Sequence, residues 1–581
     1  MMEFDGIKTR NELADFLNVS RKQLSYVLYV KGINNLYTSF EIPKKNGGVR
    51  KINAPLEELK DIQRKLAEAL HSHMKKKSKK KNNISHAFEI DKSIITNAEV
   101  HRNKRLVLNI DLKDFFGSIH FGRVRGFFNK NNKFLLPIEV ATVIAQISCF
   151  EGKLPQGAPS SPIISNLICE ILDYRLSKIS KKYKLDYTRY ADDLTFSTND
   201  KNFLGLQNEF YIEISKELIR AGFSINEDKK RLQLKDSRQV VTGIVVNKKL
   251  NVNRDYYKET RAMAHHLYKQ GKFVINGEVA SLNQLEGRFA FINQLTRYNN
   301  KKNGIKPKSF RNLLSRELQY QKFLFYKYFF ANSKPLIVTE GKTDIVYLKS
   351  ALKNLHSEYP NLITKNSDGS FEFKVSFLKK TKRLKYFLGI YQDGGSALNN
   401  IYDFFTAKKN TPNFLIYFKQ ISNTLPKNPV ILIFDNEGKN KPLGLFLNHA
   451  GLDAKKREIL DSRYMVDLID NLYLLTVPLI DGKSECDIED LFEDITLSYE
   501  ISGRKFTKED KYDTSKYYGK DMFSKYILNN YADINFNEFR SVLDNINNII
   551  GIYTNGIVDT GQDLEAKNID KSSADKVLIE I

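Results

Sequence analysis

The chain of 581 residues is long enough for more than one domain and carries a formal net charge of +24. Its three cysteines, Cys149, Cys169 and Cys486, form no Cys-x-x-Cys pair, which argues against a disulfide framework or a structural zinc site. No apolar run is long enough to span a bilayer and the first residues lack a secretory signal pattern, so we expect a cytoplasmic protein with no membrane partner.

The positive charge is concentrated in the first part of the chain. Residues 1–330 contain 59 Lys and Arg against 33 Asp and Glu, whereas the remaining residues contain 33 against 35. A Lys-rich coding bias would act on both parts, so it does not account for the difference. The asymmetry predicts a polyanionic partner, with nucleic acid favoured, for the first part only.

Two short helices are expected within residues 9–30. They could form a DNA-binding helix-turn-helix, but a helical lead-in packed on a larger domain is favoured. A β-favouring segment at 49–55 carries Arg50 and precedes a helix expected over 59–70. Arg50 could grip phosphate through paired hydrogen bonds, or it could be an ordinary surface arginine.

Three carboxylates stand at the ends of β-favouring segments. Asp111 ends an apolar run, and Asp192 and Asp193 separate two alternating segments within 188–197. The second pattern predicts a tight hairpin with two carboxylates at its tip. Converging carboxylates suit Mg²⁺, and two such ions about 3.5–4 Å apart can serve phosphoryl transfer. Neighbouring acids on a strand face opposite ways, so Asp193 is expected to be the weaker ligand.

Tyr-Ala-Asp-Asp at 190–193 matches the Tyr-x-Asp-Asp box of reverse transcriptases, and the Asp111 segment resembles the first catalytic motif of that family. Phe116 falls where these enzymes place the side chain that excludes a ribose 2′-OH. Leu-Pro-Gln-Gly at 154–157, followed by an expected helix to about Ser177, is similar to their template- and nucleotide-positioning motif, which implies substrate contacts at Gln156 and Gly157.

The resemblance also assigns two basic residues. Arg50 lies in a segment that resembles the fingers, where a basic side chain meets the incoming triphosphate. Lys229 falls where a lysine of the family helps pyrophosphate to leave, although the adjacent Lys230 is an alternative. Helical periodicity from about Asp255 to Phe330 suits a thumb that grips the duplex backbone.

Two further segments narrow the resemblance to retron reverse transcriptases. Asn97 and His101 form an Asn-Ala-x-x-His motif, and Val241, Thr242 and Gly243 form a Val-Thr-Gly motif. Both are retron signatures, and the resemblance implies RNA recognition at these five residues. The paired signatures disfavour a group II intron or diversity-generating polymerase.

The retron resemblance implies a particular reaction and its partners. The enzyme would use dNTPs to copy a cognate structured non-coding RNA into branched, RNA-linked single-stranded DNA (msDNA), which starts from the 2′-OH of an internal guanosine. Two Mg²⁺ ions would be held by Asp111, Asp192 and Asp193. Retrons are associated with antiphage defence, so the same role is expected here.

After Ser333, two apolar strand-like segments end in acids, first Glu340 and later Asp435 with Glu437. This arrangement resembles the TOPRIM domain of topoisomerases, primases and overcoming-lysogenization-defect nucleases, although the usual Asp-x-Asp is Asp-x-Glu here. An acidic run at 487–493 resembles their late acidic motif. The resemblance implies a metal-dependent nuclease acting on nucleic acid, with one or two Mg²⁺ or Mn²⁺ ions held by Glu340, Asp344, Asp435, Glu437 and Glu489.

The expected architecture is α+β followed by α/β: a right-hand polymerase with palm, fingers and helical thumb, then a Rossmann-like TOPRIM domain with a parallel sheet. The alternative is a second half that only binds nucleic acid or mediates assembly on an inactive TOPRIM scaffold. The oligomeric state is left open. The expected divisions are palm and fingers to about 235, thumb about 236–315 (polymerase 1–315), helical linker 316–333, TOPRIM 334–500, and an extension of unknown role 501–581.

Overall fold

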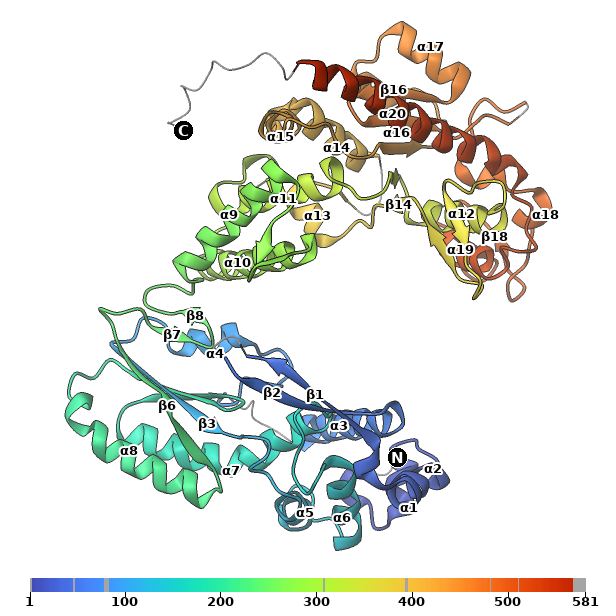
Figure 1. Ribbon diagram of the computed structural model, residues 1–581. Helices are drawn as coiled ribbons and strands as arrows, with labels where there is room; N and C mark the ends of the chain where they lie inside the picture. The colour runs from blue at the N-terminus through green and yellow to red at the C-terminus, as the bar shows by residue number, and fades with distance from the viewer. Residues whose placement is uncertain are drawn as a thin grey trace. The chain divides into compact units, whose positions relative to one another are not determined.

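The computed structural model describes residues 3–44, 47–77, 83–306, 309–391, 395–480, 482–509 and 511–567, with side chains to residue 556. The chain forms two compact units, residues 1–254 and 255–581, and each is described by itself (Figure 1). No helix within the described residues combines the length and apolar character that a membrane crossing requires.

A four-stranded antiparallel sheet in the order β4-β5-β3-β6 forms the centre of the first unit. Its strands are β3 (Leu106–Lys113), β4 (Asp186–Tyr190), β5 (Asp193–Thr198) and β6 (Ser224–Leu234). The strands alternate in polarity, so Leu108 and Phe196 face a large apolar core, whereas Ser197 lies on the opposite face. The predicted hairpin is confirmed as the connection from β4 to β5.

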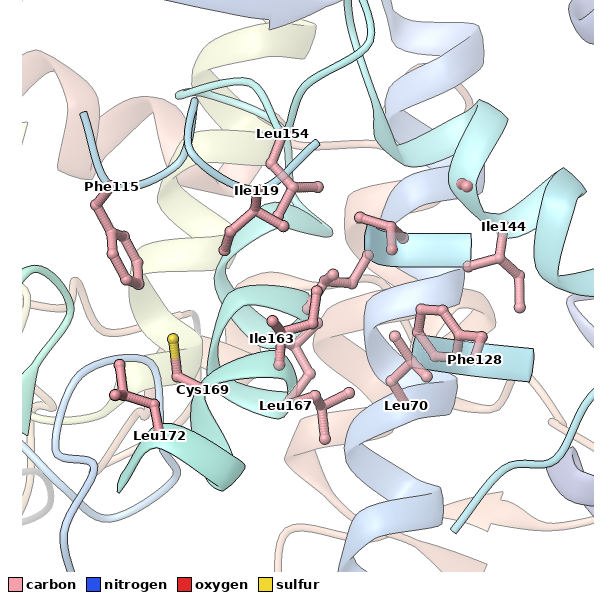
Figure 2. Packing of buried hydrophobic residues seen from close by; sticks show 14 of the residues in the cluster. Leu70, Phe115, Ile119, Phe128, Ile144, Leu154, Ile163, Leu167, Cys169 and Leu172 are labelled. Carbon is pink, nitrogen blue, oxygen red and sulfur yellow. The ribbon is translucent and has the colours of Figure 1, made fainter. Parts of the chain in front are cut away.

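Helices surround this sheet and complete the apolar core. The long α7 (Ser161–Lys182) and α8 (Phe203–Arg220) contact each other and the sheet. Figure 2 shows side chains from α3, α5, α6 and α7 interlocking in the core, among them Leu70, Phe128, Ile144 and Ile163. The remaining helices and strands of this unit are α1 (Arg10–Phe16), α2 (Arg21–Ser25), β1 (Tyr37–Pro43), β2 (Val49–Pro55), α3 (Glu57–Lys77), α4 (Ile94–Val100), α5 (Phe121–Lys130), α6 (Ile138–Ser148), β7 (Val240–Val241) and β8 (Ile244–Val245), with short 3₁₀ or π helices at Phe4–Gly6, Tyr26–Gly32 and Ile33–Leu36.

The second unit is built on a five-stranded sheet in the order β14-β11-β15-β17-β16. Its strands are β11 (Leu336–Thr339), β14 (Ser376–Phe377), β15 (Val430–Phe434), β16 (Met465–Ile469) and β17 (Leu472–Thr476). Four strands are parallel and the edge strand β16 is antiparallel, so the expected parallel sheet carries one reversed edge. Both faces are apolar and covered, as parallel sheets require.

Helices that precede, connect and follow the strands of this sheet in the sequence belong to the same unit. They are α9 (Arg254–Gln270), α10 (Leu282–Lys302), α11 (Ser315–Phe325), α12 (Lys342–Asn354), α13 (Lys382–Leu388), α14 (Ser396–Thr406), α15 (Phe414–Ser422), α16 (Pro442–Ala450), α17 (Ala454–Arg463), α18 (Asp494–Leu497), α19 (Lys520–Asn529) and α20 (Arg540–Lys567). Short 3₁₀ or π helices lie at Phe310–Asn312, Tyr326–Phe330, Lys408–Asn410, Ile488–Leu491 and Asn537–Phe539, and short strands at Val274–Ile275, Glu278–Val279, Ile363–Lys365, Phe371–Phe373, Lys505–Phe506 and Tyr517–Tyr518.

The expected thumb shares one hydrophobic core with the second half of the chain. Phe325 at the end of α11 packs its ring against Phe405 of α14 and Phe418 of α15. The same cluster includes Phe289 of α10 and Leu432 of β15. The division between units therefore falls after Arg254, ahead of the thumb helices, and the segment expected as a linker is part of this core.

The opposite face of the second sheet packs on helices from the last part of the chain. Ile431 and Leu475 of the sheet lie in one cluster with Phe523 of α19 and Leu543 of α20. The segment after residue 500, which has no assigned role from sequence, thus contributes α20 to the cover of this face, beside α12.

Candidate active sites

Strand pairing brings the three carboxylates of the first unit together. Asp111 near the end of β3 lies directly opposite Asp193, the first residue of β5. Asp192 occupies the preceding turn, and its carbonyl oxygen accepts a hydrogen bond of 3.0 Å from the Leu112 amide. Ala191 adopts a left-handed φ of 56°, which allows the chain to reverse tightly before the two acids.

Two side chains of β6 hold the Asp111 carboxylate. Lys229 Nζ lies 3.0 Å from Oδ1 and 3.1 Å from Oδ2 of Asp111. Asn226 Nδ2 donates a 3.1 Å hydrogen bond to the same Oδ1. Lys229 is thus brought to the site as expected, whereas Asn226 is a contact that the sequence reasoning missed. A spacing of three residues on a strand gives no signal for it, because the pairing of β3 with β6 shifts register beside Asp111.

Burial and mutual repulsion perturb the other two carboxylates. The pKa of Asp193 is raised to about 7, first by burial and then by the charges of Asp192 and Asp111. Burial, with a further contribution from Asp111, also raises the pKa of Asp192. Three crowded carboxylates, two of them with raised pKa values, are a donor set that fits a divalent cation, because the cation would offset their repulsion.

A cleft of about 850 Å³ opens onto these carboxylates. Its lining includes most of the residues expected to contact substrate or metal: Arg50, Asp111, Phe116, Gln156, Asp192 and Lys229. Gly157 lies beside this cleft at a φ of 133°, and a Cβ there would come 2.6 Å from the Asn53 carbonyl oxygen. The Asn53 amide also donates to the Gln156 carbonyl, so the Gln-Gly loop is attached to β2, the strand of Arg50.

The first signature motif contacts the hairpin of β4 and β5, which is called the catalytic hairpin because it carries the candidate catalytic residues Asp192 and Asp193. Asn97 of α4 and His101, which follows α4, are both fully buried. His101 Nε2 lies 2.7 Å from Thr188 Oγ1 of β4, and His101 Nδ1 lies 2.7 Å from Ser197 Oγ of β5. Thr188 in turn donates a 2.6 Å hydrogen bond to Asn97 Oδ1. The expectation that these two residues contact RNA needs correction for this conformation, because neither exposes any side-chain surface.

The second signature motif forms a tight turn against the same helix. Val241 ends β7 and is buried, whereas Thr242 and Gly243 occupy the turn with φ values of 46° and 82°. Thr242 Oγ1 lies 3.4 Å from the carbonyl oxygen of Ile94, the first residue of α4. A β-branched residue rarely adopts a left-handed φ, and such strain is frequent at functional sites. Thr242 and Gly243 have accessible surface, so RNA contact by this turn stays a prediction.

A buried ion pair supports the catalytic hairpin from the other side. Arg189 of β4 is fully buried and makes two-pronged contacts with Asp173 of α7, the shorter being 2.8 Å from Nη2 to Oδ2. Its Nη1 also lies 3.3 Å from the Ala191 carbonyl oxygen in the turn. The sequence reasoning missed this pair, although an arginine within an apolar strand segment was a signal for it.

The second unit brings its predicted acids to one edge of the sheet. Glu340 follows β11 and Asp435 follows β15, and these strands are neighbours in parallel register. Asp435 Oδ1 accepts a 3.0 Å hydrogen bond from the Ile488 amide, which ties Glu489 to the same edge. Asp344 caps α12 by accepting from the Gly341 amide at 2.8 Å.

Burial, together with the charges of neighbouring acids, raises the pKa values of Glu340 and Asp435. Burial, with the charges of Glu437 and Asp344, raises the pKa of Glu340 to about 7. The pKa of Asp435 is raised well above its usual range, chiefly by burial. Oε1 of Glu340 and Oε1 of Glu489 are buried without a hydrogen-bond partner. Buried carboxylate oxygens without hydrogen-bond partners fit a hard divalent cation.

Neither group of acids is preassembled as a metal cage, since no three His, Cys, Asp or Glu side chains of the described residues are arranged to hold one ion. Lysines approach the second group instead. Lys520 Nζ of α19 lies 3.0 Å from Glu489 Oε2, and Lys508 Nζ lies 2.6 Å from Asp487 Oδ1 and 2.9 Å from Asp490 Oδ1. These lysines belong to the segment after residue 500, for which the sequence reasoning had no account.

The fold and the carboxylate site of the first unit define a reverse transcriptase. Residues 42–258 match the family "Reverse transcriptase (RNA-dependent DNA polymerase)". The retron Ec86 reverse transcriptase of Escherichia coli is 33% identical over 297 residues, which are 49% of this chain and 85% of that protein. The chain belongs to the retron reverse transcriptase family.

Other relatives extend beyond the matched region. The retron Mx162 reverse transcriptase of Myxococcus xanthus is 36% identical over 317 residues, or 48% of this chain and 62% of that protein. The retron Mx65 reverse transcriptase of the same organism is 34% identical over 244 residues, or 39% of this chain and 55% of that protein. This chain therefore spans less than two thirds of either relative. Among solved structures, apo telomerase from Candida tropicalis aligns over 50% of this chain and 60% of its own at 13% identity, with a TM-score of 0.29.

Proposed function

We propose that the chain is an RNA-directed DNA polymerase that copies a cognate structured non-coding RNA into msDNA. The observation that carries this proposal is the register of Asp111 opposite Asp193, with Asp192 in the adjoining turn and a cleft before them. Mg²⁺ held by Asp111, Asp192 and Asp193 would supply charge stabilisation for nucleotidyl transfer.

The residues around the carboxylates have separate roles in this proposal. Arg50 would bind the triphosphate of a dNTP and Phe116 would exclude nucleotides that carry a 2′-OH. Lys229 would hold the Asp111 carboxylate in the free enzyme and donate a proton to the departing pyrophosphate. Gln156 would position the template and nucleotide from a loop attached to β2. Each role is supported by the position of the side chain at one cleft.

The test is sequencing of nucleic acid that copurifies with the full chain. Short DNA joined 2′–5′ to one RNA species is expected with the wild type and absent with Asp192→Ala/Asp193→Ala. Tyr174→Ala, which changes an exposed residue of α7, is the control and should retain the product. Bulk cellular RNA without linked DNA in the wild type would contradict the proposal.

We further propose that the second unit is a metal-dependent nuclease effector of the TOPRIM type, restrained by the RNA–DNA product in antiphage defence. The support is the convergence of Glu340, Asp435 and Glu489 at one strand edge, with buried oxygens that lack partners. Mg²⁺ or Mn²⁺ would be held by these acids, with Asp344 and Glu437 as further ligands, and would supply an activated water.

Glu340→Gln separates this proposal from a second half that only binds nucleic acid or mediates assembly. The variant is expected to lose metal-dependent cleavage of nucleic acid and toxicity in cells, while msDNA synthesis stays at the wild-type level. Glu372→Gln, on the exposed strand 371–373, is the matched control. Loss of msDNA synthesis with Glu340→Gln would contradict two separable activities, and unchanged toxicity would favour the binding module.

A further inference from the structure

We propose that Asn97 and His101 are positioning residues that hold the catalytic hairpin in register. They act through the hydroxyls of Thr188 and Ser197, one on each strand of that hairpin. The inference rests on the proposed polymerase function and assigns this signature to the geometry of catalysis instead of to contact with RNA.

With Asn97 Oδ1 as the acceptor, the hydrogen bonds define one pattern of protons across the network. The only hydroxyl proton of Thr188 is donated to Asn97 Oδ1, so Thr188 Oγ1 must accept from His101 Nε2. A neutral imidazole with its proton on Nε2 then accepts at Nδ1 from the Ser197 hydroxyl. Burial lowers the pKa of His101 to about 3, which agrees with the neutral ring.

The network acts directly on the strands that carry the catalytic acids. Thr188 lies two residues before the end of β4, and Ser197 lies four residues after Asp193 on β5. All four side chains of the network are at most 1% exposed, so loss of one bond leaves a buried polar atom unpaired. Because each strand of the hairpin has its own bond to the same imidazole, His101 fixes their offset as well as their distance from α4.

The two faces of the hairpin are thus held by different chemistry. On one face, the Arg189–Asp173 ion pair joins β4 to α7. On the opposite face, the neutral imidazole joins both strands to α4, against which the Thr242–Gly243 turn also packs. A hairpin clamped on both faces keeps Asp192 and Asp193 at a defined position relative to Asp111. A misplacement of about 1 Å in such a site can cost about 10²-fold in rate.

The experiment measures DNA synthesis by the full chain on two templates. One is the cognate RNA, and the other is oligo(dT) annealed to poly(rA), which requires no recognition of retron RNA. His101→Leu is expected to lower kcat about 10²-fold on both templates while KM for the dNTP changes less than about threefold. His101→Gln, which keeps a donor and an acceptor, should restore most of the kcat.

Two further variants separate positioning from a general loss of stability. His73→Leu removes another buried histidine of the first unit, whose Nε2 donates to the Lys133 carbonyl outside this network, and should lower Tm without lowering kcat. As a single change, Thr188→Val should lower kcat. In the His101→Leu background it should lower kcat little further, because both changes break the same bond.

Three outcomes would overturn the inference. Loss of synthesis by His101→Leu on the cognate RNA alone would make His101 a determinant of RNA recognition. A loss of kcat by His73→Leu equal to that of His101→Leu would reduce the effect to stability. A wild-type protein that is inactive on both templates would instead remove the proposed polymerase function on which the inference rests.

Discussion

Asp111 and Asp193 face each other across a pair of antiparallel strands, β3 and β5. Like charges in directly opposed positions destabilise a sheet. Asp192 in the adjoining turn adds a third carboxylate, and burial together with this repulsion raises the pKa of Asp193 to about 7. Gathering three carboxylates at this site of the first unit therefore reduces the stability of the fold while it places oxygen ligands close together.

Asp193→Asn is expected to stabilise the metal-free protein at neutral pH. The Asp193 carboxyl has a higher pKa in the folded chain than its ordinary 3.8, so the stability of the wild type falls as pH rises from about 4 to about 7. The variant lacks this loss and should melt about 2–4 °C higher at pH 7.5 in EDTA, with a smaller difference at pH 4.5.

Asp200→Asn is the control for this comparison. The Asp200 carboxyl is half-buried and its pKa is lowered, chiefly by a backbone hydrogen bond from Asn202, so its removal should give no gain in Tm at pH 7.5. An Asp193→Asn melting curve that matches the wild type at both pH values would show that the carboxylates repel each other less than their register implies.

Gly157→Ala is expected to reduce DNA synthesis at least tenfold. The added Cβ would come 2.6 Å from the Asn53 carbonyl oxygen, so β2 and the Gln156 loop must separate and shift Arg50 at the cleft. Gly152→Ala is the matched control, since Gly152 also has a positive φ but has open space around its Cβ position. Steady-state kcat/KM for a dNTP measures both, and equal losses would mean that backbone strain alone is responsible.

Arg189→Met is expected to destabilise the first unit by about 3–5 kcal/mol, because it leaves Asp173 as a buried charge without its counter-ion. Arg21→Met breaks an ion pair with Asp15 of similar geometry at the surface and should leave stability nearly unchanged, because solvent screens an exposed pair. Urea denaturation gives both values. Similar small effects from the two variants would indicate that water reaches Asp173 in solution.

Phe325→Ala is expected to loosen both the thumb helices and the second sheet. Its ring packs on Phe405 and Phe418, and large-to-small changes of buried Phe cost about 3–5 kcal/mol. Hydrogen exchange should accelerate in α9–α11 and in β11 and β15 together. Phe203→Ala in the core of the first unit should instead accelerate exchange around α8. Faster exchange confined to the thumb in Phe325→Ala would contradict a shared core.

Local patterns were sufficient to predict several strands and helices and the positions of candidate acids in both units. Alternation of polar and apolar residues predicted the hairpin of β4 and β5, and strand ends predicted the positions of Asp111 and Glu340. The helix expected over 59–70 and the helix expected to about Ser177 are confirmed within α3 and α7. These features depend on residues close together in the sequence.

Long-range partners were not predictable in the same way. The apolar residues of α11 predict that one face of the helix is buried, but they do not predict which helices cover that face. In the sequence, His101 is an isolated polar residue. In the folded chain, β4 and β5 place Thr188 and Ser197 beside it. Lys520 reaches Glu489 only because α19 packs against α12 of the second unit. Each of these relationships is a product of tertiary packing.

The core shared by the thumb helices and the second sheet has a consequence for how such chains can be recombined. A junction placed near residue 333 would cut through the ring cluster of Phe325, Phe329 and Phe330 and expose apolar surface on both products. A junction at Arg254–Asp255 leaves every ring of that cluster with its partners. In chimaeras between relatives, and in exchanges during their evolution, the expected thumb helices α9–α11 should therefore be transferred together with the second half of the chain and not with residues 1–254.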